Sequence, residues 1–380
     1  MNILNNYIPE IILAFSAVII FTLNILINPF SKRKIFYSLT IFIIGIVLAT
    51  LAQVSASYKD IDLTFIFKCY FSISAIIFIF TYSKKFHAAE HLAIIGIILS
   101  AFLILSSRAP IITFSSMTMF MLCTYSFMLT RERLISQEGL FLVTATIILI
   151  LLYKVSPLLS SSSLIVLSTI YFIKTRNKDI EALIIFFVTP ILTYLLIRCF
   201  AGAESSYMTT LTSLMSFTLL IISSVLILFT KKEHDEKRAT KYGLFYLGNI
   251  LLFIGMGTKD SIALSIILTI LIPFTYSHRL TLLSVANMGM LPITPSFIAK
   301  YLFSSLLIKA GAWIESSVLL IASLIFWVSG AYDICDNFRN KTRSKVLSLL
   351  SILVLLSVAI FFNSFHNMLK ISIESILRTN

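Results

Sequence analysis

The sequence contains few charged residues. Of its 380 residues only 12% are Asp, Glu, Lys or Arg, whereas 58% are hydrophobic. A soluble globular domain of average composition is about one quarter charged, so this chain could not cover a water-exposed surface with polar groups. The composition therefore excludes a soluble domain and predicts a protein embedded in a lipid bilayer.

The residue patterns of metal, redox and nucleotide sites are also missing. The four cysteines are scattered, without the paired spacing of a metal or redox motif, and we interpret them as small apolar packing residues. The histidines are not clustered, and no glycine-rich phosphate loop occurs. We therefore expect no catalytic residues, no metal and no cofactor bound by this chain, and no self-contained active site.

Long apolar runs are present instead. They recur from end to end, and each is about 18 to 22 residues long, enough to cross about 30 Å of hydrocarbon as a helix. Barrel strands would alternate polar and apolar residues, whereas Gly139 to Tyr153 is apolar almost all round, so the spans are predicted to be helices. The first run is expected to be a span and not a signal peptide, because residues 1–9 contain no Lys or Arg.

We predict an all-α, polytopic integral membrane protein with about fourteen transmembrane helices. Residues 1–380 are expected to form a single transmembrane domain, with residues 366–380 as an amphipathic tail on the membrane surface. The predicted spans are 8–28, 36–55, 63–82, 90–106, 110–130, 139–155, 159–174, 180–200, 208–230, 242–257, 260–277, 281–308, 312–332 and 345–363.

The basic residues alternate between the connections. About twenty fall in the odd-numbered connections and about six in the even-numbered ones, and a wrong number of spans would destroy this alternation. Because Lys and Arg collect on the cytoplasmic side, the odd connections are predicted to be cytoplasmic and both termini periplasmic. The same bias explains the net charge of +13 without a nucleic-acid partner.

Lys300 is the strongest functional candidate. It lies well inside the twelfth predicted span and follows Pro292 and Pro295, which should kink or break the helix. A broken helix exposes backbone groups that can hold water or ions, and a lysine within a span suits a proton relay. The alternative is a lysine that snorkels or occupies a polar pocket lined by protein.

The other charges near spans have simpler explanations. Lys68 lies inside the third span, while Lys154 and Arg198 lie near span ends, where snorkelling to the interface accounts for them. Glu10 is at a helix start, where a carboxylate complements the helix dipole. His91, beside Glu90 at the start of the fourth span, is expected to be interfacial.

Four stretches resemble the antiporter-like membrane subunits of respiratory complex I, most closely subunit N. They resemble that subunit's first span, its fourth and fifth helices, its junction of the ninth and tenth helices, and its broken twelfth helix with the following span. The four are IPEIILAFSAVIIFTLNIL at the start, residues 90–128, EKRATKYGLFYLGNILLFIGMG at 236–257, and LPITPSFIAKYLFSSLLIKAGAWIESSVLLIASLIFW at 291–327.

The resemblance implies a fold of two inverted repeats, each with a broken helix, and buried charges that conduct protons. Lys300 would then be the lysine of the second half-channel, in a twelfth helix broken at Pro292 and Pro295. The lysine of the seventh helix would correspond to Lys174 or Lys154.

Three positions depart from the family pattern. Met119, Ile191 and Leu247 stand where the family carries a glutamate, a lysine and a histidine. Either the buried charges have been rerouted, or the chain keeps a scaffold role while proton conduction has been weakened or lost.

The expected function is that of a membrane subunit in a bacterial inner-membrane NADH:quinone oxidoreductase, where it contributes to proton translocation. NADH and quinone would be used by the wider complex, and the partners would be its other membrane subunits and the lipid bilayer. The alternatives are a subunit of a cation/proton antiporter or membrane-bound hydrogenase, a non-conducting scaffold, and an unrelated lipid or polysaccharide flippase. A flippase would line a central cavity with polar residues, and this chain has few inside its spans.

Overall fold

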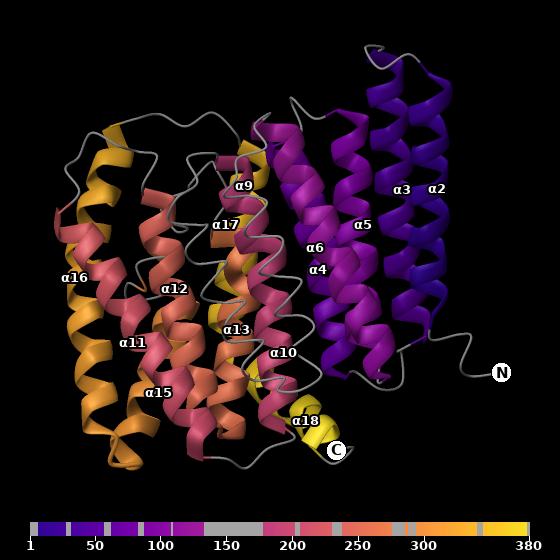
Figure 1. Cartoon of the computed structure of the whole chain (residues 1–380). Helices are drawn as coiled ribbons and strands as arrows, with labels where there is room; N and C mark the ends of the chain where they lie inside the picture. Colours follow the sequence, from indigo (N-terminus) through magenta and orange to yellow (C-terminus); the bar gives the residue numbers. More distant parts are fainter. Residues whose placement is uncertain are drawn as a thin grey trace. The chain divides into compact units, whose positions relative to one another are not determined.

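Helices form every regular element in the described part of the chain (Figure 1). This confirms the predicted all-α fold. The computed structural model describes residues 7–27, 32–56, 62–82, 87–107, 109–132, 178–201, 206–229, 238–275, 286–287, 290, 294–339 and 345–377.

The chain divides into two compact units. Unit 1 comprises Met1–Tyr171 and Ala182–Ile191, and unit 2 comprises Phe172–Glu181 and Leu192–Asn380. The chain passes between them within two helices, α9 (Lys178–Leu183) and α10 (Thr189–Ala201). The expected single transmembrane domain stays a prediction.

Unit 1 is built around a central helix. Its helices are α2 (Ile8–Leu26), α3 (Lys32–Ala56), α4 (Leu63–Tyr82), α5 (Ala88–Ser106) and α6 (Pro110–Glu132). Within α5, 83% of the span is buried, against 28% within each of α2 and α3, so α5 forms the core of the unit. Figure 1 shows α2 and α3 side by side, and their exposed faces are apolar, as lipid-facing helices require.

Small residues bring the helices of unit 1 close together. A Cβ added at Gly96 of α5 would lie 2.5 Å from the Cys123 sulfur of α6, and one at Gly45 of α3 would collide with the Ser16 side-chain oxygen of α2. Any larger residue would therefore force these helices apart. Membrane helices depend on such contacts, because lipid gives no hydrophobic drive for helix association.

A π-helical turn, η2 (Ile184–Val188), lies between α9 and α10. Pro190 follows it and has no N–H, so it cannot donate to the carbonyl of Phe186 four residues earlier. The Tyr70 hydroxyl of α4 donates to that carbonyl instead, at 3.1 Å. A tertiary contact from α4 thus supplies a donor in place of the N–H that Pro190 lacks.

In unit 2 the aromatic side chains pack the helices. The main elements are α11 (Ser206–Phe229), α12 (Arg238–Gly255), α13 (Lys259–Thr275), α15 (Pro295–Lys309) and α16 (Trp313–Arg339). Phe253 of α12 stacks on Phe303 of α15 at 3.9 Å, and Phe245 of α12 stacks on Phe326 of α16 at 3.6 Å. Helix α12 therefore links α15 to α16, and α11 packs along its length.

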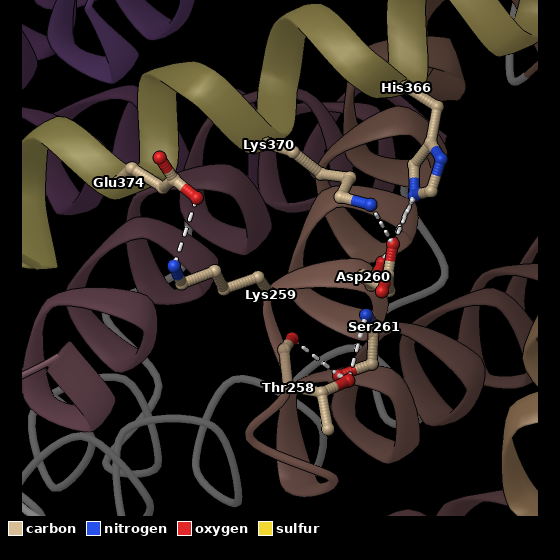
Figure 2. A network of polar contacts seen from close by, with 7 residues as sticks. All are labelled: Thr258, Lys259, Asp260, Ser261, His366, Lys370 and Glu374. Atoms are coloured by element: carbon tan, nitrogen blue, oxygen red, sulfur yellow. Dashed lines mark hydrogen bonds and ion pairs between the residues drawn. The ribbon is translucent and has the colours of Figure 1, made fainter.

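The C-terminal tail is helical. Helix α17 (Lys345–Ile360) and helix α18 (Phe362–Leu377) meet at a bend of 79° between Ile352–Ile360 and Phe362–Glu374. Figure 2 shows how ion pairs attach α18 to the start of α13: Lys259 to Glu374 at 2.9 Å, and Lys370 to Asp260 at 2.7 Å. The placement of residues 366–380 on the membrane surface stays a prediction.

The helices agree with the predicted spans wherever the structure describes them. Among the described residues, five helices, all in unit 1, are long and apolar enough to cross a membrane, and the α17–α18 pair adds a sixth candidate if it is one bent span. The spans predicted at 139–155 and 159–174 lie outside the described residues, so the number fourteen stays a prediction. Within the span predicted at 281–308, Met290 and Thr294 are not helical and α15 begins at Pro295, so the helix is interrupted beside the prolines as expected.

Candidate functional site

Lys300 lies in the second turn of α15, where the chain returns to regular helix. Pro295 is the first residue of the helix. A backbone N–H at this position would have no acceptor within the helix, so the proline costs no helical hydrogen bond. Thr294 caps the helix by accepting a hydrogen bond from the Phe297 backbone N–H at 3.3 Å. Pro295 therefore begins α15 without interrupting it, and Pro292 lies outside the described residues.

The Lys300 ammonium is buried against aromatic rings. The residue is 4% exposed, and Nζ lies 4.6 Å from the Trp327 ring centroid and 5.8 Å from that of Phe297. A cation over aromatic faces at these distances gains a favourable electrostatic interaction. Within the described ranges, no atom accepts a hydrogen bond from Nζ. A buried lysine in this state is an uncommon and costly arrangement.

Polar contacts hold the segment before α15 against α12. The Tyr246 hydroxyl and the Ser296 hydroxyl are 2.5 Å apart, and the Ser296 backbone N–H donates to the Asn287 side-chain oxygen at 3.1 Å. The Trp327 indole donates to the Met290 carbonyl at 2.8 Å, and Met290 has a left-handed backbone with φ of 50°. These bonds satisfy backbone groups that an interrupted helix leaves open.

Two further buried polar atoms accompany Lys300 in unit 2. They are the Asn249 side-chain oxygen of α12 and the Asn287 side-chain nitrogen, which find no hydrogen-bond partner among the described residues. Polar atoms in this situation are where proteins hold ordered water. The apolar interior of unit 2 therefore holds three polar atoms that have no hydrogen-bond partner among the described residues.

Unit 1 contains a second buried lysine, which pairs with a carboxylate. Lys68 Nζ of α4 lies 2.7 Å from Glu10 Oε1 of α2, and the two side chains are 3% and 4% exposed. The Ser106 hydroxyl of α5 donates to the same Glu10 oxygen at 2.5 Å, and Lys68 also donates to the Gln53 side-chain oxygen of α3 at 3.3 Å. Four helices thus contribute to one polar cluster, which we call the Glu10 cluster.

The sequence analysis singled out both Glu10 and Lys68 but explained each of them separately. It did not predict that the two form an ion pair. The sequence does contain a signal for this ion pair. The first and third spans run in the same direction, and each carries one of the two opposite charges within two turns of its N-terminal end. His91 differs from its expected interfacial position, since it is buried and its Nδ1 lies 2.8 Å from the Ser38 hydroxyl.

The remaining sequence candidates are two lysines and three apolar residues. Lys154 and Lys174 lie outside the described residues. Met119 lies on α6, Ile191 on α10 and Leu247 on α12, so these apolar residues occupy helices as the resemblance implied. Among the residues that the structure describes, no group of His, Cys, Asp or Glu has the arrangement of a metal site.

Two solved structures resemble the chain in fold. One is a chain of respiratory complex I from Thermus thermophilus with bound Aureothin: 12% identity, a TM-score of 0.66, and coverage of 95% of this chain and 99% of that chain. The other is a chain of the Mrp complex from Dietzia sp. DQ12-45-1b, at 13% identity and a TM-score of 0.70, covering 98% of this chain and 52% of that chain. The chain thus spans about half the length of the Mrp chain.

No family model and no curated protein matches the sequence. At 12% and 13% identity the two likenesses establish the fold alone. The antiporter-like fold that the four sequence stretches indicated is confirmed at that level.

Proposed function

We propose that the chain is a membrane subunit of a bacterial NADH:quinone oxidoreductase and that it contributes to proton translocation. The observation that carries the proposal is the likeness to a respiratory complex I chain over 95% of this chain and 99% of that one. Coverage of nearly all of both chains supports a subunit with the same architecture. NADH and quinone would be bound by other subunits, and this chain would sit among membrane subunits of the inner membrane.

Lys300 is the residue proposed to carry protons. Its ammonium is buried, faces the rings of Trp327 and Phe297, and has no carboxylate partner among the described residues. A lysine held by an ion pair would give up its proton only at the expense of that pair, and no described carboxylate places this constraint on Lys300. Water bound along Asn249 and Asn287 would deliver protons to Nζ and remove them.

A subunit of a cation/proton antiporter is the second candidate. It is supported by the TM-score of 0.70 to the Mrp chain, although this chain covers only 52% of that protein. A membrane-bound hydrogenase subunit and a non-conducting scaffold are two further candidates. Met119, Ile191 and Leu247 support the scaffold, because each replaces a charged or titratable family residue with an apolar one.

Two measurements separate these possibilities. The tagged chain is purified in mild detergent and the proteins that copurify with it are identified. NADH dehydrogenase and quinone-reducing subunits support the proposal, and their absence overturns it.

Proton translocation is then measured in inverted membrane vesicles for Lys300→Ala. The matched control is Lys309→Ala, which replaces an exposed lysine on the same helix. Loss of translocation in Lys300→Ala with normal assembly supports conduction, whereas unchanged translocation indicates a scaffold.

A further inference from the structure

A pocket lies at one end of the helices of unit 2. Its volume is about 400 Å³, and residues of α11, α12, α15 and α16 line it. They come from the first half of α11, the last turns of α12 and α15 and the first turn of α16, or stand directly next to these helix ends. Lys300 does not line the pocket, whose size suits a small molecule or a lipid headgroup.

One carboxylate and several hydroxyl groups form the polar part of the wall. Among the described residues that line the pocket, Glu315 alone is ionisable, and Thr209, Thr210 and Ser213 contribute hydroxyls. The Glu315 carboxylate and the Ser213 hydroxyl are partly exposed and take part in no hydrogen bond or ion pair within the described ranges. Both can therefore accept hydrogen bonds from a ligand that replaces water.

The charges around the pocket favour a cation. Two helices begin here and two end here, so the partial charges of their dipoles largely offset each other and the charge of Glu315 remains. Two lysines stand at the same helix ends, and neither lines the pocket. Lys259 pairs with Glu374 of α18 at 2.9 Å, and Lys309 is exposed to solvent.

The acceptors select one kind of organic cation. A primary ammonium has three N–H donors, which match a carboxylate and neighbouring hydroxyls. A quaternary ammonium has no N–H donor and is recognised by a cage of aromatic rings, whereas Phe217 is the only aromatic residue among the described lining residues. The wall is therefore suited to a primary amine and not to a choline group.

The apolar surroundings indicate that this amine belongs to a lipid. Trp313, the first residue of α16, is 65% exposed beside the pocket, and exposed tryptophans mark the depth of the lipid headgroups. Helices α11 and α16 pack against each other, and exposed apolar side chains continue along both. These side chains include Leu214, Ile221, Val225, Ile314, Ile321 and Val328.

We propose that this pocket binds the headgroup of a phospholipid that carries a primary amine. The ammonium donates hydrogen bonds to the Glu315 carboxylate and the Ser213 hydroxyl, and the phosphate stays at the open mouth of the pocket. The acyl chains lie along the exposed apolar faces of α11 and α16. The site is separate from Lys300, so the inference does not rest on proton translocation.

The test is native mass spectrometry of the purified full chain in detergent. It is titrated with phosphatidylethanolamine and phosphatidylcholine that have identical acyl chains. The wild type should bind phosphatidylethanolamine about tenfold more tightly, the gain from a hydrogen bond to a charged group. Glu315→Gln should lower this affinity to the level of phosphatidylcholine, and Ser213→Ala should remove part of the difference. Glu374→Gln, an exposed carboxylate outside the pocket, should keep the full preference.

Each variant is compared with its own affinity for phosphatidylcholine, which separates headgroup recognition from a general loss of folding. Ser213→Ala provides the same comparison if Glu315→Gln does not fold. Equal affinities of the wild type for the two lipids would overturn the inference, as would an unchanged preference in Glu315→Gln. Free ethanolamine at the lipid concentration should not displace the lipid. Displacement would assign the pocket to a water-soluble amine and would also overturn the inference.

Discussion

The Tyr70 hydroxyl of α4 bonds the Phe186 carbonyl of η2 at 3.1 Å, and this contact compensates for the missing N–H of Pro190. In an apolar interior no bulk water can replace the donor. The contact explains how a proline inside the sequence of a buried helix is accommodated without an orphaned carbonyl.

Tyr70→Phe is therefore expected to destabilise the protein by about 0.5 to 1.5 kcal/mol, the usual net contribution of one intramolecular hydrogen bond. Unfolding in mixed micelles with increasing denaturing detergent measures the change. Tyr37→Phe is the control, because that ring is 47% exposed on α3. Equal stability of the two variants would show that the Phe186 carbonyl does not depend on Tyr70.

Gly96→Ala should cost about 1 to 3 kcal/mol through overpacking, because the added Cβ would lie 2.5 Å from the Cys123 sulfur. Cys123→Ala in the same chain removes that sulfur and should recover most of the loss. The double-mutant cycle gives the coupling free energy directly. A coupling near zero would mean that some contact other than Cys123 limits the size of residue 96.

Lys68→Met should cost about 3 to 5 kcal/mol, since it leaves the Glu10 carboxylate buried without its partner. The double substitution Glu10→Gln with Lys68→Met should be considerably more stable than Lys68→Met alone, because no uncompensated charge remains. Lys259→Met breaks the half-exposed pair with Glu374 and serves as the comparison, with an expected cost under about 1 kcal/mol. Similar costs for the two single lysine variants would contradict the burial of the Glu10 cluster.

Asp260→Asn removes the carboxylate that pairs with Lys370 at 2.7 Å and lies 3.7 Å from His366 (Figure 2). Both lysine and carboxylate are more than one third exposed, so the expected loss is under about 1 kcal/mol and should shrink further as salt screens the pair. Thermal unfolding at low and high ionic strength measures it. A large loss of stability that does not depend on salt would contradict the interpretation of Asp260 as a member of an exposed ion pair.

Much of the fold could be predicted because the relevant signals are local. Apolar length requires helices in a bilayer, so the ranges of α2 to α6 follow the hydropathy closely. The direction that the alternating loop charges predict for these helices stays a prediction. Pro292 and Pro295 predicted the break, but not that Pro295 would start the helix with Thr294 as its cap. That detail depends on tertiary contacts at the start of α15, where Ser296 bonds Tyr246 and Asn287.

The sequence by itself determined that this chain is a helical membrane protein with a lysine placed after a helix break. Hydropathy is the same all round an apolar helix, so it cannot say which helices are neighbours or which faces meet. Only the tertiary structure decided that Glu10 and Lys68, which are 58 positions apart, form one buried pair, and that Lys300 faces Trp327 and no carboxylate of the described residues. Pairing of buried charges depends on helix order and rotation, because an ion pair forms only when the packing brings the two groups within about 4 Å of each other.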